Sequence, residues 1–186
     1  MRGLTPKAQQ MLLQIARDSI KRGLKKGKPK LPDISDLPAE LTAERATFVT
    51  LTIGEHLRGC IGMLEVTRPL AEDVAENAFA AAFHDPRFPP LSRDEFDELK
   101  ISISVLSPPE EMTFSSEADL LSQIRPGIDG LILQDGFQKG TFLPSVWEQL
   151  PQKEMFFEHL KLKTGLPAGY WSDTFRVFRY TAEYIH

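Results

Sequence analysis

The chain has 186 residues, of which 41% are hydrophobic and 26% charged, and its formal net charge is -4. This balance predicts one domain over residues 1–186 and excludes extended disorder, because burial of apolar surface offsets the entropy lost on ordering the chain. The apolar runs are too short for a membrane span, and the start has no apolar signal core, so we expect a cytoplasmic protein that has no membrane partner. A single cysteine excludes an internal disulfide and a multi-cysteine metal site, and no metal site is predicted.

The N-terminal segment predicts a helix followed by extended chain. Thr5 fits an N-cap with Pro6 at the first helical position, and apolar residues recur at steps of three and four up to Leu24. Three prolines between residues 28 and 39 exclude a helix there. Six basic residues lie within 21–30, but no aromatic residue is interleaved with them. We therefore expect a solvated helix end, and nucleic acid is not the partner that the sequence favours.

The middle of the chain predicts strands and helices joined in close succession. A hairpin is expected from strands 47–53 and 57–64, because the first strand alternates and is rich in β-branched residues. A helix is expected over 69–83, capped by Thr67 and stopped before Pro86. Ser92 and Glu95 have capping-box spacing for a short helix, which a strand over 100–107 follows.

The C-terminal part predicts a second hairpin, a helix and a final strand. Asp135-Gly136 is the expected turn, since this pair tolerates positive φ. The helix is expected over 152–163, and the final strand over 174–184. These elements predict an α+β fold with a largely antiparallel sheet flanked by helices. The C-terminal aromatic residues fit either a core or an interface: Tyr170, Trp171, Tyr180 and Tyr184.

The segment Leu57-Arg58-Gly59-Cys60-Ile61-Gly62 is the most informative for chemistry. In an extended strand Arg58, Cys60 and Gly62 share one face, and a guanidinium there favours the thiolate of Cys60. Gly59 and Gly62 leave the backbone open to close approach by another group. The alternative is structural, with Cys60 as a small buried hydrophobic residue and the glycines marking a β-bulge.

A second cluster follows the central helix, at Asp85, Arg87 and Phe88. Arg87 could hold a carboxylate or phosphate bidentately, whereas the alternative is a local Asp85–Arg87 ion pair with Phe88 filling the core. If Arg58 and Arg87 converge without partners, an anion is expected between them, because the two cations would otherwise repel each other. Cys60 is thus the candidate catalytic residue, and the candidate ligand-binding residues are Arg58, Gly59, Gly62, Asp85 and Arg87.

The hexapeptide Leu57–Gly62 resembles the hallmark of the AMMECR domain family, whose bacterial members are the A proteins of the AmmeMemoRadiSam system. Other segments of this sequence resemble family segments in the same order, from about residue 5 to the end. They are His84–Leu91, Ile103–Ser107, Gly127–Leu131, Leu143–Val146 and Lys163–Leu166.

The resemblance implies a mixed fold with a larger and a smaller lobe and a cleft between them, lined by the hallmark motif. It also implies pathway partners in bacteria, a dioxygenase-like protein and a radical-SAM protein, and a substrate-adaptor role in animals. No biochemical activity is established for the family. Asp129 stands where the family often has histidine, so a Cys–His pair using that turn is not expected. The remaining candidate bases are His56, His84 and His159.

Two hypotheses about function stay open. The chain could be an enzyme, or part of one, that acts on a small anionic substrate with Cys60 as nucleophile or redox thiol. It could instead be a binding or scaffold module without chemistry of its own, because no complete catalytic set is present. The sequence contains no glycine-rich phosphate loop and no hydrolase elbow, and it names neither a substrate nor a cofactor.

Overall fold

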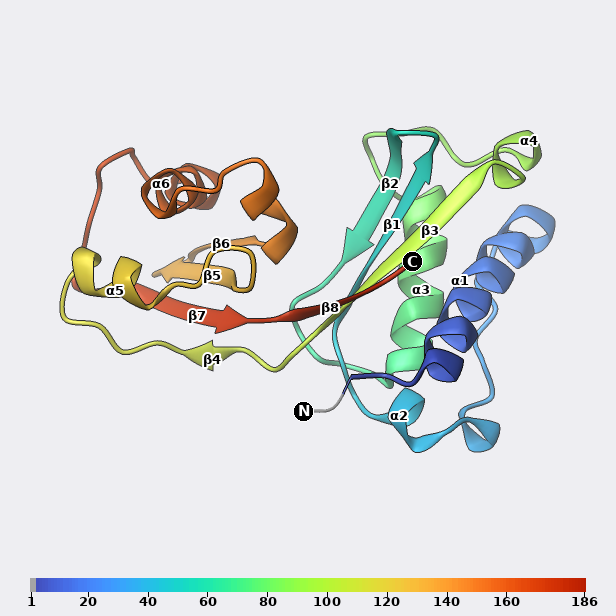
Figure 1. The fold of residues 1–186 in the computed structure, drawn as a ribbon. Coiled ribbons are helices and arrows are strands. Elements are labelled where there is room, and N and C mark those ends of the chain that lie inside the picture. Colours follow the sequence, from blue (N-terminus) through green and yellow to red (C-terminus); the bar gives the residue numbers. More distant parts are fainter. Residues whose placement is uncertain (1–2) are drawn as a thin grey trace. The chain divides into compact units, whose positions relative to one another are not determined.

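The computed structural model describes residues 3–186, which divide into two compact units (Figure 1). The first unit comprises the chain up to Leu106 together with the C-terminal residues Glu183–His186, and the second unit is Ser107–Ala182. Each unit has its own four-stranded sheet and its own apolar core. The α+β fold with antiparallel sheets that the sequence predicts is confirmed. None of the helices in the described part of the chain is long and apolar enough to cross a membrane.

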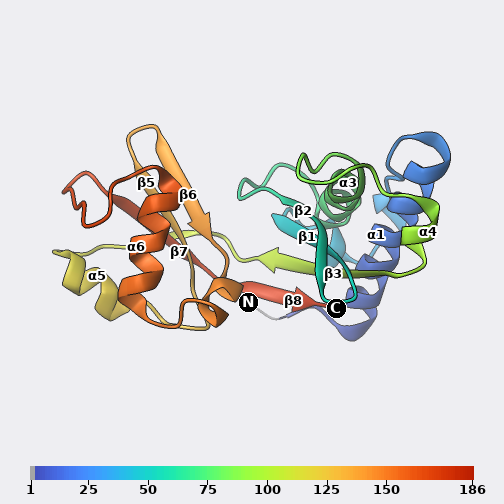
Figure 2. The ribbon, with the colours of Figure 1, turned by 90° about the horizontal axis from the view of Figure 1, so that it is seen from above.

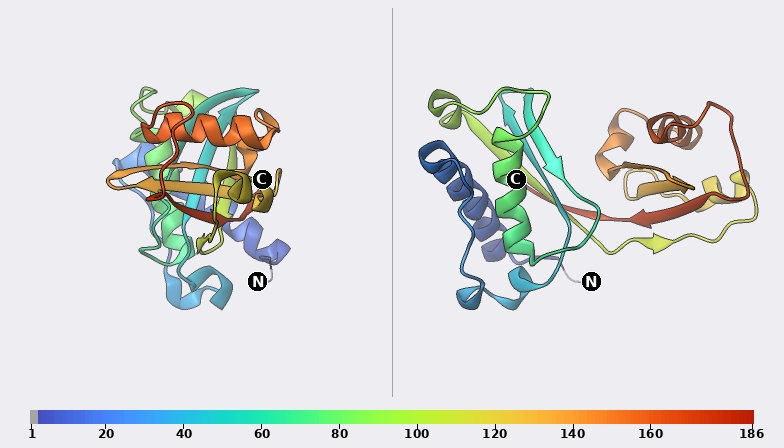
Figure 3. Two further views of the ribbon diagram at one scale, coloured as in Figure 1. Left: turned by 90° about the vertical axis from the view of Figure 1, so that its left-hand side faces the viewer. Right: turned by 180° about the vertical axis from the view of Figure 1, so that it is seen from behind.

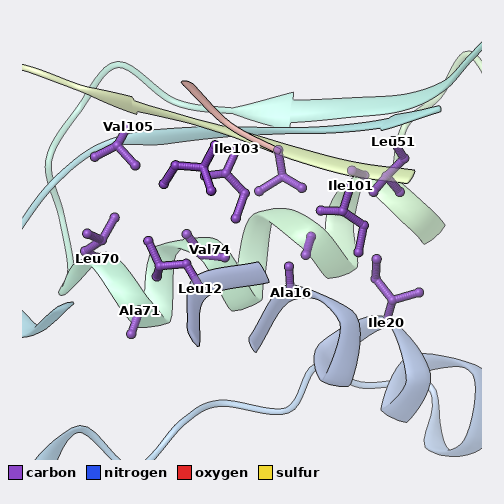
Figure 4. Close-up of a cluster of buried hydrophobic side chains, with 14 of the residues drawn as sticks. Leu12, Ala16, Ile20, Leu51, Leu70, Ala71, Val74, Ile101, Ile103 and Val105 are labelled. Atoms are coloured by element: carbon purple, nitrogen blue, oxygen red, sulfur yellow. The ribbon is translucent and has the colours of Figure 1, made fainter. Parts of the chain in front are cut away.

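The first unit packs two helices on one side of a sheet whose strand order is β2-β1-β3-β8. Figure 4 shows α1 and α3 side by side beneath the strands, with aliphatic side chains between them. The strands are β1 Thr47–Ile53, β2 His56–Gly62, β3 Leu99–Leu106 and β8 Ala182–Ile185. The helices are α1 Pro6–Lys26, η1 Ile34–Asp36, α2 Ala39–Thr42, α3 Leu70–Phe83 and α4 Arg93–Phe96.

Helix α1 begins at the N-cap that the sequence predicts. The Oγ1 atom of Thr5 accepts a hydrogen bond from the backbone N–H of Ala8 at 3.2 Å, and Pro6 occupies the first turn. Gly27 ends the helix in the left-handed region, with φ of 70°. The predicted capping box of Ser92 and Glu95 is also present at the start of α4.

Helix α3 starts differently from the prediction. The expected cap, Thr67, is wrong: the N-cap position is Pro69, which makes no side-chain capping bond. The first N–H group finds another partner, since Leu70 donates to the carbonyl of Ala43 at 2.8 Å. The start of α3 is therefore held by the segment before β1 rather than by a hydroxyl group.

A buried polar network fastens α3 to β1. Thr47 donates its hydroxyl to Asp73 at 2.6 Å, and Asn77 donates its amide to the same hydroxyl at 3.0 Å. Arg68 pairs with Asp73, Nε to Oδ1, at 2.7 Å. Because each buried group in this network has a partner, the network fixes the register of the helix on the sheet.

The helix and the edge strand β2 approach each other at Gly59. A Cβ atom on Gly59 would lie 2.1 Å from the carbonyl oxygen of Ala81 in α3. The alanine-rich face of α3 and the missing side chain of Gly59 together allow this contact. Two alanines of α3, Ala78 and Ala81, are buried.

The second unit has strand order β4-β7-β5-β6, and α6 lies over β5 and β6 (Figures 2 and 3). Its core is aromatic, with the rings of Trp147 and Phe156 stacked at 3.8 Å between centroids. The strands are β4 Glu110–Glu111, β5 Gly130–Asp135, β6 Gln138–Phe142 and β7 Arg176–Tyr180. The helices are α5 Glu117–Gln123, η2 Pro144–Glu148 and α6 Lys153–Thr164.

The predicted final strand over 174–184 is divided between the two sheets. Strand β7 belongs to the sheet of the second unit, whereas β8 belongs to the sheet of the first. The sequence did not decide whether the C-terminal aromatic residues belong to a core or to an interface. In the structure, Tyr180 is buried and Tyr184 is exposed. The predicted hairpin turn is confirmed, with Gly136 at φ of 61°.

We predict that Gly59→Ala destabilises the first unit by about 1–3 kcal/mol, because a backbone carbonyl cannot move aside as a flexible side chain can. Urea unfolding should be followed by circular dichroism, since both tryptophans, Trp147 and Trp171, lie in the second unit. The control is Leu57→Ala on the same strand, which is 42% exposed and should change stability by less than about 0.5 kcal/mol. Equal unfolding midpoints for the two variants would contradict the close approach of β2 and α3.

Candidate functional site

The candidate residues gather where the loop 84–92 runs along the free edge of β2. Strand β2 is the last in its sheet, so its outer backbone groups have no neighbouring strand. Asp85 accepts a hydrogen bond from the backbone N–H of Cys60, N to Oδ2, at 3.0 Å. Arg87 places Nη2 at 3.5 Å from the carbonyl oxygen of Cys60. The two side chains of the loop thus take the place of a further strand at Cys60.

Asp85 is the buried anchor of this arrangement. Its carboxylate accepts from the backbone N–H of Arg87 at 3.1 Å and pairs bidentately with the guanidinium, at 3.0 Å from Nε and 2.7 Å from Nη2. The hydrogen bonds from Arg87 hold the pKa of Asp85 well below its ordinary value, although burial opposes this. The Asp85–Arg87 ion pair that the sequence offers as the structural alternative is therefore present.

Arg87 is nevertheless open to solvent. Its side chain is 56% exposed although its partner Asp85 is almost completely buried. Within residues 3–186 no acceptor lies within hydrogen-bonding distance of its Nη1 atom. One edge of the guanidinium is fixed by the protein, and the other is available to a ligand.

Arg58 is buried, at 7% exposure, and it forms an ion pair and a hydrogen bond with other groups of the first unit. It pairs with Glu95, Nε to Oε2, at 2.6 Å, and donates from Nη2 to the carbonyl of Pro89 at 2.7 Å. Its remaining atom, Nη1, is buried and has no hydrogen-bond partner among the described residues. Arg58 lowers the pKa of Glu95 to about 2, so this carboxylate is charged near neutral pH.

The two arginines meet at one aromatic ring, that of Phe88. The Cζ atoms of Arg58 and Arg87 lie 5.7 Å and 5.5 Å from the ring centroid. Both candidate cations therefore contact the same ring. Each already has a carboxylate partner, however, so repulsion between unpaired guanidiniums does not demand an anion here.

The two glycines of the motif are explained by contacts within the chain. Gly59 faces α3, as described above, and a Cβ atom on Gly62 would lie 2.3 Å from the carbonyl oxygen of Thr47. The register of β1 and β2 shifts between Leu51 and Thr52, which leaves Arg58 without a paired residue. This β-bulge interrupts the alternation that would place Arg58 and Cys60 on one face.

Cys60 is half-buried, and its thiol contacts a hydroxyl group rather than a guanidinium. The Sγ atom lies 3.3 Å from Oγ1 of Thr50. Thr50 pairs with Cys60 on one side and with Ser102 on the other, so these three residues form a row across β2, β1 and β3. They alternate with the buried Leu51 and Ile103, which places the row on the sheet face away from α1 and α3. No motif in the sequence singles out Thr50, although it lies opposite Cys60 in the hairpin of β1 and β2.

The remaining candidates lie elsewhere or have structural partners. Asp129, in the second unit, is buried and pairs with Arg125 at 2.6 Å, while its carbonyl accepts from the indole N–H of Trp147 at 2.7 Å. Neither His56 nor His84 nor His159 has a hydrogen bond to Cys60 in the part of the chain described. No group of three potential metal ligands is found among residues 3–186.

We predict that Glu95→Gln destabilises the first unit near neutral pH and that the difference from the wild type narrows in acid. A carboxylate with a depressed pKa contributes stability that is present above its ordinary pKa of 4.5 and is lost as the pH falls toward about 2. Urea unfolding at several pH values between about 6 and 2.5 measures the difference. Glu98→Gln, at a nearby exposed position, serves as the control. A difference that is independent of pH would contradict the Arg58–Glu95 ion pair.

Comparison with known proteins gives the family of this chain. The AMMECR1 family model matches residues 13–185. A protein of Methanothermobacter thermautotrophicus is 40% identical over 182 residues, covering 94% of this chain and 92% of its own, and one of Thermotoga maritima is 42% identical over 161 residues, covering 84% and 86%. The crystal structure of the uncharacterized protein PH0010 from Pyrococcus horikoshii matches with a TM-score of 0.88 and 34% identity, over 97% of this chain and 92% of that one. The chain belongs to the AMMECR1 family.

Proposed function

We propose that this AMMECR1-family protein binds a small anionic ligand, a carboxylate or a phosphate, where the loop 84–92 meets β2. The observation that carries the proposal is the state of Arg87. Its guanidinium is fixed on one edge by the buried carboxylate of Asp85 and exposed on the other. A pre-oriented donor loses little conformational entropy when a ligand binds, and a charge-assisted hydrogen bond from Nη1 gives the ligand a defined position.

Cys60 is the candidate reactive group beside this position. Its backbone is bound by Asp85 and Arg87, and its thiol contacts the hydroxyl of Thr50 at 3.3 Å. A ligand held at Arg87 would therefore lie near a thiol and a row of hydroxyl groups. Thiol chemistry on this ligand, in a pathway with dioxygenase-like and radical-SAM proteins, is the catalytic form of the proposal.

The second candidate function is a protein-binding or scaffold module without chemistry of its own. One observation favours it: most of the hallmark residues have partners within the fold. Gly59 and Gly62 accommodate neighbouring backbone, and Arg58 pairs with Glu95. A motif whose side chains are needed for folding does not require a substrate to explain it.

Ligand binding is tested with acetate and inorganic phosphate, followed through the backbone amide resonances of Cys60 and Arg87. We expect saturable shifts in the wild type and an affinity lower by roughly tenfold or more in Arg87→Gln, because a charge-assisted hydrogen bond is lost. Arg93→Gln, at an exposed position, is the control and should bind as the wild type does. Following these two amides excludes signals from binding elsewhere on the chain.

Removal of Arg87 also leaves the buried Asp85 without its ion pair, so a second variant is needed. Arg87→Lys keeps a cation beside Asp85 but loses the planar fork that presents Nη1. We expect this variant to fold as the wild type does and to bind both probes more weakly. Wild-type affinity in Arg87→Lys, or no saturable shift in the wild type, would overturn the proposed ligand site.

The role of the thiol is tested by alkylation, which is simple to follow because Cys60 is the only cysteine. We expect a saturating concentration of the bound anion to slow the modification of Cys60 by iodoacetamide in the wild type and not in Arg87→Gln. Intact mass measures the rate. Equal rates of alkylation with and without the anion would show that the thiol of Cys60 is not part of the ligand site. If Cys60→Ser also retained its pathway partner and the pathway output, the scaffold function would be favoured.

A further inference from the structure

The second half of α1 presents a basic face that the proposed ligand site does not involve. Measured from Asp18, the basic residues follow at spacings of three, four, seven and eight positions, and these spacings share one face of a helix. They are Lys21, Arg22, Lys25 and Lys26. The buried residues of α1 lie on its other side, toward α3 and the sheet.

The chain then turns back and brings a further cation to this face. Gly27 reverses the direction in the left-handed region. The hydroxyl of Ser19, which is fully buried, donates to the carbonyl of Ala75 at 2.7 Å and accepts from the backbone N–H of Lys30 at 3.3 Å. These hydrogen bonds hold the backbone of Lys30 beside Ser19 of α1, close to the start of the basic face.

The result is a hollow of about 350 Å³ with a strongly positive lining. Its lining consists of five cationic side chains and one carboxylate: Asp18, Lys21, Arg22, Lys25, Lys26 and Lys30. The carboxylate of Asp18 accepts from Nε2 of Gln14 at 2.8 Å. The chain as a whole has a net charge of -4, so the hollow has the opposite sign to the rest of the molecule.

The cations of the hollow differ from the other basic residues described above because they form no ion pair with any residue from 3 to 186. In the described part of the chain, ion pairs involve six other basic side chains: Arg58, Arg68, Arg87, Arg125, Lys161 and Arg176. Over residues 3–186 no ion pair is formed by a cation of the hollow. The helix dipole accounts for Lys25 and Lys26 in the last turn, but it falls off before Lys21 and does not act on Lys30 in the loop.

We propose that this hollow binds a compact small molecule with several phosphate groups. Its volume is within the range of small-molecule sites, which is roughly 300–1,000 Å³. Four of the five cations are lysines, which bind phosphate as mobile point charges. None of the described residues that line the hollow is aromatic, so they offer no platform on which nucleic-acid bases could stack. The charge and the size together favour a small polyphosphate over a nucleic acid.

The test uses the full chain and sodium tripolyphosphate, with calorimetry at low ionic strength. We expect saturable binding that is stronger than that of orthophosphate and that weakens as NaCl is added. The double variant Lys21→Gln/Lys25→Gln should bind roughly tenfold more weakly or worse. These positions are exposed, so the circular dichroism spectrum should not change.

The matched control is Lys7→Gln/Lys139→Gln, which removes the same charge at exposed positions outside the hollow. Its affinity should stay within about twofold of the wild type, because neither side chain lines the hollow. Three outcomes would overturn the proposal: no saturable binding, equal losses in both double variants, or an RNA oligonucleotide that binds and is not displaced by tripolyphosphate. The last outcome would make nucleic acid the occupant. Because Arg87 is intact in both double variants, failure here leaves the proposed ligand site unaffected.

Discussion

The buried carboxylate of Asp85 is the group on which the candidate site depends. It receives the edge N–H of Cys60, the backbone N–H of Arg87 and the guanidinium of Arg87 at once. A carboxylate can be buried in this way only because charged and neutral donors together offset its loss of hydration. This one carboxylate therefore links the loop 84–92, the guanidinium of Arg87 and the backbone of Cys60.

The basic residues are of two kinds: some are paired with carboxylates within the fold, and others are free to bind an anion. Lys161 illustrates the first kind, since it is fully buried and pairs with both Glu117 and Glu158. Such pairs hold the fold in one arrangement and offer nothing to a ligand. Arg87 is intermediate, because it is paired on one edge and exposed on the other. The cations of the α1 hollow form no ion pair with any of the described residues. Function is expected where pairing is incomplete, because only there does an incoming anion gain a new interaction.

Local rules predicted much of the fold, and contacts between distant residues account for what they missed. The caps at Thr5 and Ser92 and the turn at Gly136 depend on a few neighbouring residues, and all were predicted. The face shared by Arg58 and Cys60 was expected from strand alternation, but one unpaired residue in the register breaks it. No spacing rule predicts such a bulge, because it depends on how β1 and β2 align as a pair.

The sequence also does not reveal why glycine is needed at positions 59 and 62, because the contacts there involve residues distant in the chain. An open backbone at Gly59 is consistent with a ligand or with a neighbouring helix, and only the position of Ala81 decides between them. Glu95 was predicted for its capping role alone, although it also neutralises a buried arginine 37 positions away in the chain. What the fold leaves unexplained is then a short set: the thiol of Cys60, the hydroxyls beside it and the free edge of Arg87. The proposed function relies on these polar groups, because the other residues of the motif already have partners within the fold.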